Sequence, residues 1–104
     1  LEGERLYLKA GNTYGEGSVT TEGFVLYAGA VISDKVSEKS LSKGSVKLRN
    51  ELLDSDSVKN YTTTKDILFS SSSAAGVFVV GYSISGPQNW KNINGITLKE
   101  LEGN

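Results

Sequence analysis

The stretch between Phe69 and Gly81 limits the possible folds more than any other part of the sequence. A hydrophobic run, residues 67–69, stops at four consecutive serines, after which two alanines and an apolar run lead to Gly81. Serine oxygens accept hydrogen bonds from the free N–H groups of a first helical turn, and alanine favours the helix that follows. Glycine suits the left-handed residue that ends a helix. The pattern therefore predicts a strand that leads directly into a buried helix.

The apolar part of this stretch contains two local signals that disagree. Residues 77–80, Val-Phe-Val-Val, prefer a strand when they are considered alone, because β-branched and aromatic side chains are typical of strands. The serines and alanines before them favour a helix. We predict the helix, with Gly81 at its end.

The remaining apolar segments predict a mostly antiparallel sheet and one more helix. Strands are expected at residues 6–8, 18–20, 24–32 and 58–69, the last interrupted by a turn at residues 65–66, and the run 24–32 should form the longest strand and a central one. The glycine-rich residues 11–17 predict a link of turns, and the polar residues 33–45 predict a mobile loop. Leu41, Leu48 and Leu52 share one side of a helix that we place at about residues 45–53. The expected fold class is α+β, a mostly antiparallel β-sheet with two main helices packed on one face.

The length and the ends of the sequence suggest one domain. A chain of 104 residues fits a single domain, residues 1–104, with one core. It opens on Leu1-Glu2-Gly3 without a methionine, and we expect a C-terminal fragment of a longer protein. The sequence has no apolar run long enough to cross a bilayer and no signal peptide, so we expect a cytoplasmic protein without a membrane partner.

The composition excludes several kinds of chemistry. The sequence has no cysteine and no histidine, which rules out a disulfide, a Ser-His-Asp triad, a Cys-His pair and a His- or Cys-based zinc site within this chain. The carboxylates show no pairing typical of acid–base catalysis. We therefore expect no catalytic residues, no metal and no cofactor. The formal net charge of −1 is less basic than that of most dedicated nucleic-acid domains.

Four segments, taken in order, resemble a known family. "TTEGFVLYAGA", "LRNELL", "FSSSSAAGVFVVGYSISGPQNW" and "NGITLKEL" are similar to a small domain of unknown function at the C-terminus of GIY-YIG nuclease-type and restriction-system proteins of bacteria and archaea. That domain is similar in turn to the restriction-enzyme adenine-methylase-associated (RAMA) domain. The matching positions are Glu22, Gly23, Phe24, Ala28, Gly29, Leu48, Arg49, Phe69, Ser70, Ser71, Ser73, Ala74, Ala75, Gly81, Gly86, Trp90, Gly95 and Leu98.

The departures from the family pattern affect polar positions more than structural ones. Ser72 replaces the family's proline, and Tyr82 stands where a basic residue is common. The resemblance implies a non-catalytic accessory module of a nuclease or restriction-type protein, which assists DNA association or senses a modified base. The alternative is a structural module that docks domains of the parent protein, which fits the near-neutral charge and Tyr82.

Five residues are candidates for contact with nucleic acid, and each has a structural alternative. Ser71 and Ser73 either hold a phosphate or simply cap a helix, and capping is favoured. Trp90, with Lys91 beside it, either stacks on a base or seals the core, and the core is favoured. Arg49 either meets a phosphate or lies along the solvent side of its helix. DNA association is favoured if Lys91, Arg49 and Lys47 converge on one concave face beside the serine turn, and docking is favoured if that face is mixed in sign and apolar.

Overall fold

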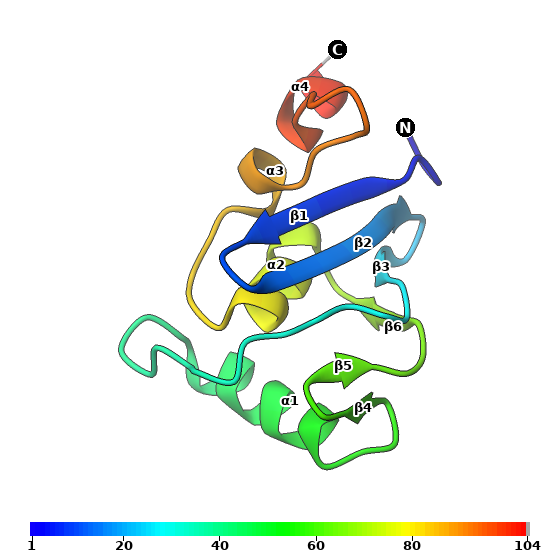
Figure 1. Cartoon of the computed structure of the whole chain (residues 1–104). Coiled ribbons are helices and arrows are strands. Elements are labelled where there is room, and N and C mark those ends of the chain that lie inside the picture. Colours follow the sequence, from blue (N-terminus) through cyan, green and yellow to red (C-terminus); the bar gives the residue numbers. More distant parts are fainter. Residues whose placement is uncertain (104) are drawn as a thin grey trace.

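Four antiparallel strands, in the order β1-β2-β3-β6, form the main sheet (Figure 1). This is a computed structural model that describes residues 1–103. The strands are β1 (Leu6–Ala10), β2 (Thr13–Thr20), β3 (Gly23–Leu26), β4 (Val58–Lys59), β5 (Thr62–Thr63) and β6 (Ile67–Phe69), of which β4 and β5 form a separate small ribbon. The helices are α1 (Lys43–Leu53), α2 (Ser72–Val80), α3 (Gly86–Asn89) and α4 (Leu98–Gly103). The predicted α+β class is confirmed.

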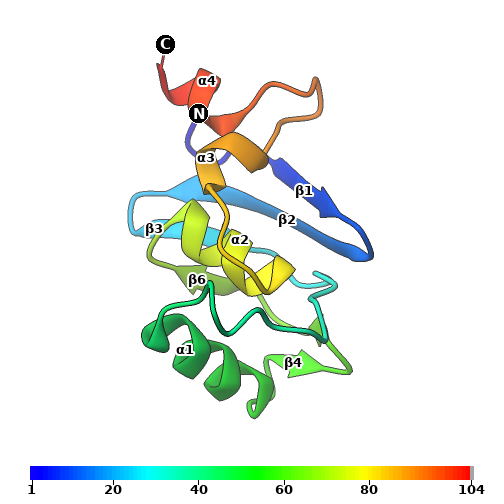
Figure 2. The ribbon, with the colours of Figure 1, turned by 90° about the vertical axis from the view of Figure 1, so that its left-hand side faces the viewer.

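The helices gather on one side of the sheet. Helix α2 packs on β2, β3 and β6, while α1 packs beside α2 and against β4. Figures 1 and 2 show that no helix of residues 1–103 lies over the opposite face of the sheet. The same residues contain no helix with the length and apolar character that a membrane span needs.

Helix α2 forms where the serine run predicts it. The Ser71 side chain accepts a hydrogen bond of 3.1 Å from the N–H of Ala74, and Gly81 ends the helix at a φ of 83°. The apolar residues that prefer strands are helical because the helix is buried, with Ala75, Phe78 and Val79 all in the core. Burial against the sheet therefore outweighs their local preference, which is a small energy per residue.

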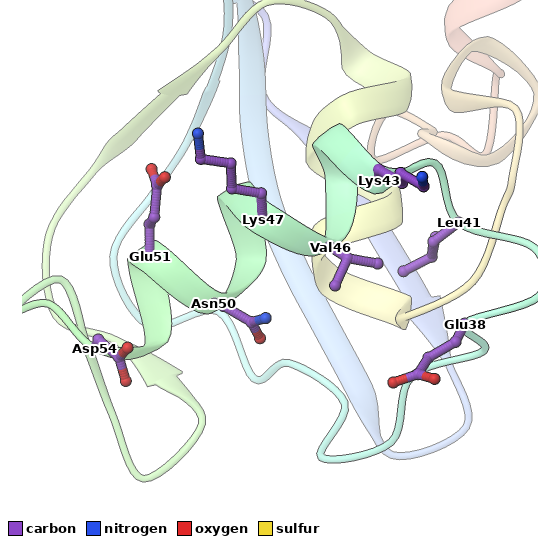
Figure 3. Close-up of a pocket in the computed structure, with 8 residues that line it drawn as sticks. All are labelled: Glu38, Leu41, Lys43, Val46, Lys47, Asn50, Glu51 and Asp54. Carbon is purple, nitrogen blue, oxygen red and sulfur yellow. The ribbon is translucent and has the colours of Figure 1, made fainter.

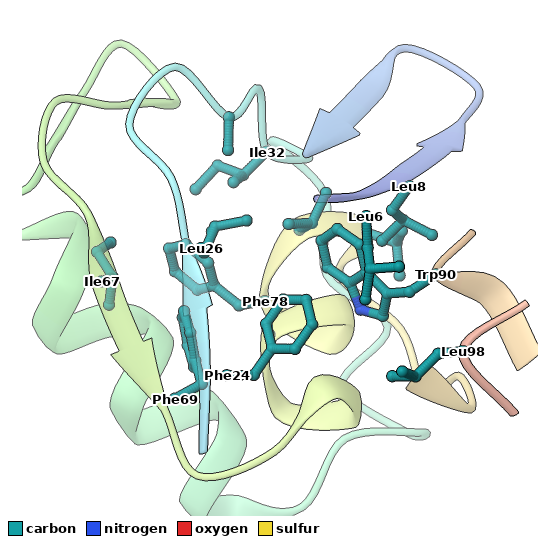
Figure 4. Close-up of a cluster of buried hydrophobic side chains, with 14 of the residues drawn as sticks. Leu6, Leu8, Phe24, Leu26, Ile32, Ile67, Phe69, Phe78, Trp90 and Leu98 are labelled. Carbon is teal, nitrogen blue, oxygen red and sulfur yellow. The ribbon is translucent and has the colours of Figure 1, made fainter. Parts of the chain in front are cut away.

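The core lies between α2 and the sheet (Figure 4). The Phe69 and Phe78 rings are 5.3 Å apart between centroids, and the Phe24 and Trp90 rings are 4.7 Å apart. Such tilted pairs each add about 1 kcal/mol to the free energy of burial. These contacts join β3, β6, α2 and the segment after α3 into one core.

The predicted link of turns at residues 11–17 is wrong, because β2 runs through it and is the longest strand. Its glycines leave room for large core side chains. A Cβ atom on Gly15 would lie 3.1 Å from Leu26 Cδ1, and one on Gly17 would lie 2.4 Å from the carbonyl oxygen of Val25 and 2.5 Å from Phe24 Cε1. Close packing of Phe24 and Leu26, rather than a turn, therefore explains the glycines in this segment.

The strand predicted at residues 24–32 is central, as expected, but it ends at Leu26. The chain then turns through Gly29, whose φ is 95°. Ala30 and Ile32 remain buried outside the strand. The continuous apolar run therefore consists of a strand and the segment after it, and does not form one long strand.

Helix α1 begins two residues before the predicted start of residue 45. Ser42 caps it by accepting a hydrogen bond of 3.1 Å from the N–H of Ser45. Leu41 therefore lies before the helix and not on its apolar side, which corrects the predicted pattern of three leucines.

Candidate nucleic-acid interface

The two candidate serines hold α2 in place. Ser71 caps the helix, and the Ser73 hydroxyl accepts a hydrogen bond of 2.8 Å from the N–H of Gly86. A Cβ atom on Gly86 would lie 2.4 Å from backbone atoms of Ser72 and Ser73, so the starts of α2 and α3 are in close contact. Both hydroxyls serve this junction, and phosphate binding by them stays a prediction.

Trp90 is buried, with 0% of its surface exposed. Its Nε1–H donates a hydrogen bond of 2.9 Å to the carbonyl oxygen of Ser72, and its ring packs on Phe24. A ring enclosed in this way is not accessible to a base. The core interpretation of Trp90 is therefore correct, and the stacking interpretation has no accessible surface.

Arg49 is also buried, with 2% of its surface exposed. Its guanidinium donates to the carbonyl oxygens of Phe78 and Ser33, so the predicted position on the solvent side of α1 is wrong. Desolvation lowers the pKa of this guanidinium from its usual value. A side chain enclosed by two carbonyl groups is not accessible to a DNA phosphate.

The position of Arg49 follows from the open end of α2. The last carbonyl groups of a helix have no partner within the helix, and they carry partial negative charge. Gly81 donates its N–H to Val77, Ser33 donates to Val79 and Arg49 donates to Phe78. Arg49 thus completes the cap of α2, and the helix end balances part of its charge.

Lys91 is exposed and lies at the edge of the sheet beside β1. The backbone of Lys91 accepts a hydrogen bond of 2.7 Å from the N–H of Tyr7 and donates one of 3.0 Å to its carbonyl oxygen. Residues directly opposite each other in an antiparallel pair project their side chains to the same face. Lys91 and Tyr7 therefore share the face of the sheet that no helix covers.

The register of the strands shows which other side chains project from the same face of the sheet as Tyr7. Tyr7 is opposite Glu16, and Glu16 accepts a backbone hydrogen bond of 2.8 Å from Tyr27. Lys9 is opposite Tyr14 in the next row. We name the side chains on this side of the sheet the open face, which consists of Arg5, Tyr7, Lys9, Tyr14, Glu16, Ser18, Val25, Tyr27, Leu68 and Lys91.

Polar contacts hold the open face in order. Glu16 accepts hydrogen bonds of 2.8 Å from Arg5 Nη1 and from the Tyr14 hydroxyl. The Arg5 guanidinium carbon lies 4.3 Å from the centroid of the Tyr27 ring, and the Tyr27 hydroxyl donates to Ser18 at 2.7 Å. Two tyrosine rings and one arginine are thereby fixed around a single carboxylate, which reduces the entropy that they would lose on binding a ligand.

The hydrogen bonds of this network shift the pKa values of Glu16 and Tyr14. The hydrogen bond from Tyr14, followed by that from Arg5, lowers the pKa of Glu16. Burial, together with the hydrogen bond to Glu16, raises the pKa of Tyr14 to about 12. At neutral pH the carboxylate is therefore ionised and the phenol is neutral.

Sequence reasoning missed the open face apart from Lys91. Tyr7 and Lys9 alternate with the buried Leu6 and Leu8, which is the period of a half-buried strand and was a usable signal. In the middle of β2 the inward positions, Gly15 and Gly17, are glycines, so the apolar half of the alternation is missing there and the outward Tyr14 and Glu16 give no pattern.

The three cations chosen as a test do not converge. Lys47 and Arg49 both lie on α1, where Arg49 is buried, while Lys91 follows α3 and pairs with Tyr7 of β1. Figure 1 shows α3 and α1 at opposite ends of the molecule. The three predicted cations therefore do not lie together on one face that could contact DNA. The open face brings together a different set, in which Lys91 is joined by Arg5 and Lys9.

The part of the chain that the structure describes holds no group of three or more His, Cys, Asp or Glu residues that could bind a metal ion. Neither a curated protein nor a solved structure matches the chain significantly. The family model described as "Domain of unknown function (DUF4357)" matches residues 6–102, which include every strand and almost all of α4. The chain therefore belongs to this family of domains of unknown function.

Proposed function

We propose that the domain is a non-catalytic accessory module that associates with DNA through the open face. One observation carries the proposal: Tyr7, Tyr14 and Tyr27 share a helix-free face with three cations and the carboxylate of Glu16. Sheet faces of this kind bind single strands, because bases stack on aromatic rings while cations meet the phosphates. The local excess of positive charge supports this role although the whole chain has a formal charge of −1.

The biological setting of the proposal comes from the sequence motifs. Their resemblance to the C-terminal domains of GIY-YIG nuclease-type and restriction-system proteins supports a place beside a nuclease domain in a longer cytoplasmic protein. In that setting the module would position DNA for the parent enzyme or sense a modified base. Catalysis would belong to the parent.

A salt titration tests the DNA proposal. Fluorescent single-stranded and duplex DNA, with and without adenine methylation, is titrated with the domain at several salt concentrations. We expect the single strand to bind, with affinity that falls as salt rises. A methylation effect would support modified-base sensing. The absence of binding to every probe at low salt would contradict the proposal.

Two matched double variants locate the contact. Lys9→Gln with Lys91→Gln removes two exposed cations from the open face, and Lys43→Gln with Lys47→Gln removes two from α1. Each phosphate contact on a single strand contributes about 0.7 to the slope of log affinity against log salt. We expect the first variant to reduce that slope by about 1.4 and the second to leave it unchanged. The opposite result would place the contact on α1.

Docking of parent domains is a second candidate, favoured by the outer surface of α1. A shallow pocket of about 620 Å³ is lined there by the apolar Leu41 and Val46, with Lys43, Lys47, Glu38, Glu51 and Asp54 around them (Figure 3). Charges of both signs around a small apolar centre are typical of protein contacts and unsuited to DNA. Hydrogen exchange that is slower at α1 in the longer protein than in the isolated domain would support docking.

A further inference from the structure

A second pocket opens at the end of the β1–β2 hairpin. It has a volume of about 530 Å³, within the range of small-molecule sites. Its lining comes from the hairpin turn, from the segment after β3 and from the regions around β5 and α2, and it includes Asn12, Val31, Lys35, Tyr61 and Tyr82. Segments far apart in sequence thus converge on one concavity.

Two tyrosines line this pocket without being buried. Tyr61 is 43% exposed and Tyr82 is 44% exposed, although large aromatic side chains usually bury most of their surface. Val31, which also lines the pocket, is 41% exposed. The pocket therefore offers three exposed apolar surfaces to a ligand.

A two-residue turn places Tyr61 at the pocket. Asn60 and Tyr61 have φ values of 53° and 58°, the left-handed region that both central residues of a tight hairpin turn adopt, and they join Lys59 of β4 to its partner Thr62 of β5. The hydrogen bond of 2.9 Å from the N–H of Ile32 to the carbonyl oxygen of Tyr61 fixes this turn against the segment after β3. The position of Tyr61 in the lining therefore follows from the β4–β5 ribbon.

The polar groups of the lining suit a polar ring. Asn12 supplies an amide, and Lys35 lies near Ser33, whose carbonyl oxygen accepts from the buried Arg49. Lys35 and Asp34 are the two charged residues of the lining, and their charges cancel. The lining therefore favours a ring with hydrogen-bonding groups over a strongly charged ligand.

We propose that this pocket binds a single nucleobase, stacked against Tyr61 and Tyr82. The pocket adjoins the open face at Val31, which pairs with Tyr14 through backbone hydrogen bonds of 2.8 and 2.9 Å. Ala10, Thr13 and Val80 line it from the side of the sheet that α2 covers, so a base from a strand on the open face would enter it around the end of the sheet. The choice of a nucleobase rests on the proposed function, while the pocket itself does not.

Mononucleotides test the pocket separately from the open face. The ¹⁵N-labelled domain is titrated with dAMP, dTMP and, as a probe without a base, deoxyribose 5-phosphate. We expect both nucleotides to shift the amide signals of Val31, Ser33 and Tyr82, and the base-free sugar phosphate to shift none of them. Equal shifts with all three probes would indicate a phosphate site and overturn the inference.

Two variants remove the rings. Tyr61→Asn removes the ring while keeping a residue that tolerates positive φ, and Tyr82→Ser removes the other ring. We expect each to weaken nucleotide binding about 5-fold or more, the effect of losing one stacking contact. Leu48→Ser, which removes a 41% exposed apolar side chain from α1, is the matched control and should change nothing. An unchanged amide spectrum elsewhere establishes that each variant is folded.

The outcomes separate the two proposals. If oligonucleotides bind with salt dependence but mononucleotides do not shift the pocket, the pocket inference is wrong and the proposed function stands. If mononucleotides bind and both ring variants weaken them, while the Lys9 and Lys91 substitutions leave oligonucleotide binding unchanged, the pocket inference holds and the open-face function is wrong. Ring variants that bind mononucleotides as well as the wild type also overturn the pocket inference.

Discussion

The guanidinium of Arg49 on α1 donates a hydrogen bond to the carbonyl oxygen of Phe78 in the last turn of α2. A second hydrogen bond, to Ser33, ties the same side chain to the segment after β3. No side-chain carboxylate of residues 1–103 forms an ion pair with it. The hydrogen bonds by which Arg49 links these three segments therefore end on backbone groups, and its charge faces the negative end of a helix.

Replacement of Arg49 by methionine should lower the free energy of unfolding by about 2–3 kcal/mol, because two carbonyl groups lose a charged donor and stay buried. Arg49→Lys should fall between methionine and the wild type, since one ammonium cannot reproduce the fork of the guanidinium. Urea denaturation followed by circular dichroism measures both.

Lys47→Met is the control for the arginine series, since Lys47 lies on the same helix but is exposed. It should change the free energy of unfolding by no more than about 0.5 kcal/mol. An Arg49→Met variant as stable as the wild type would mean that the cost of burying the charge equals the gain from its hydrogen bonds.

The sequence allowed α2 to be predicted because its signals are local. Ser71 and Gly81 identify the ends of the helix within one stretch, and both act as caps. The identity of β2 was not predictable in this way, because Gly15 and Gly17 take their meaning from Phe24 and Leu26 on the neighbouring strand. Short-range patterns cannot contain a packing requirement that joins two strands.

The residues of the candidate site also differ in whether local sequence signals could predict their positions. Trp90 and Arg49 were singled out by residue type, and both are buried. Residue type favoured the core for Trp90, but it could not indicate that Arg49 is buried. Lys91 reaches the open face only because the segment after α3 pairs with Tyr7, a contact between residues that are far apart in sequence. The tyrosines of the open face come together through strand register, which the sequence did not reveal.

Gly17→Ala should strongly destabilise the domain. The added Cβ would lie 2.4 Å from the carbonyl oxygen of Val25, so the strands or the Phe24 ring must shift. Overpacking of this kind costs about 1–3 kcal/mol, and backbone contact places this case at the upper end. Thermal denaturation followed by circular dichroism should show a lower Tm.

Gly44→Ala, in contrast to Gly17→Ala, should stabilise the domain. Gly44 lies in the first turn of α1, and its nearest neighbour to an added Cβ is the Ser42 hydroxyl at 4.0 Å. Alanine should therefore raise the free energy of unfolding by about 0.5–1 kcal/mol, since it favours the helix without a clash. Equal effects of the two glycine substitutions would refute the packing explanation for β2.

Trp90→Phe should destabilise the domain without weakening DNA binding by the folded protein. The smaller ring leaves a cavity beside Phe24, and the carbonyl oxygen of Ser72 loses the indole donor. Together these changes should cost about 2 kcal/mol or more. Denaturation and DNA titration on the same variant separate a core residue from a stacking residue. A large loss of affinity with an unchanged Tm would show that Trp90 reaches the base.

The Tyr14 phenol should give the domain an alkaline stability limit. Its pKa is raised from 10.0 to about 12, so between these values the folded state keeps a proton that the unfolded state loses. Stability contributed by Tyr14 is therefore complete below pH 10 and falls as the pH rises toward 12. Tyr14→Phe removes this group, and its free energy of unfolding should fall less between pH 9 and pH 11 than that of the wild type. Equal falls in both proteins, or absorbance at 295 nm showing that all tyrosines titrate together near pH 10, would contradict the burial and hydrogen bonding of Tyr14 on the open face.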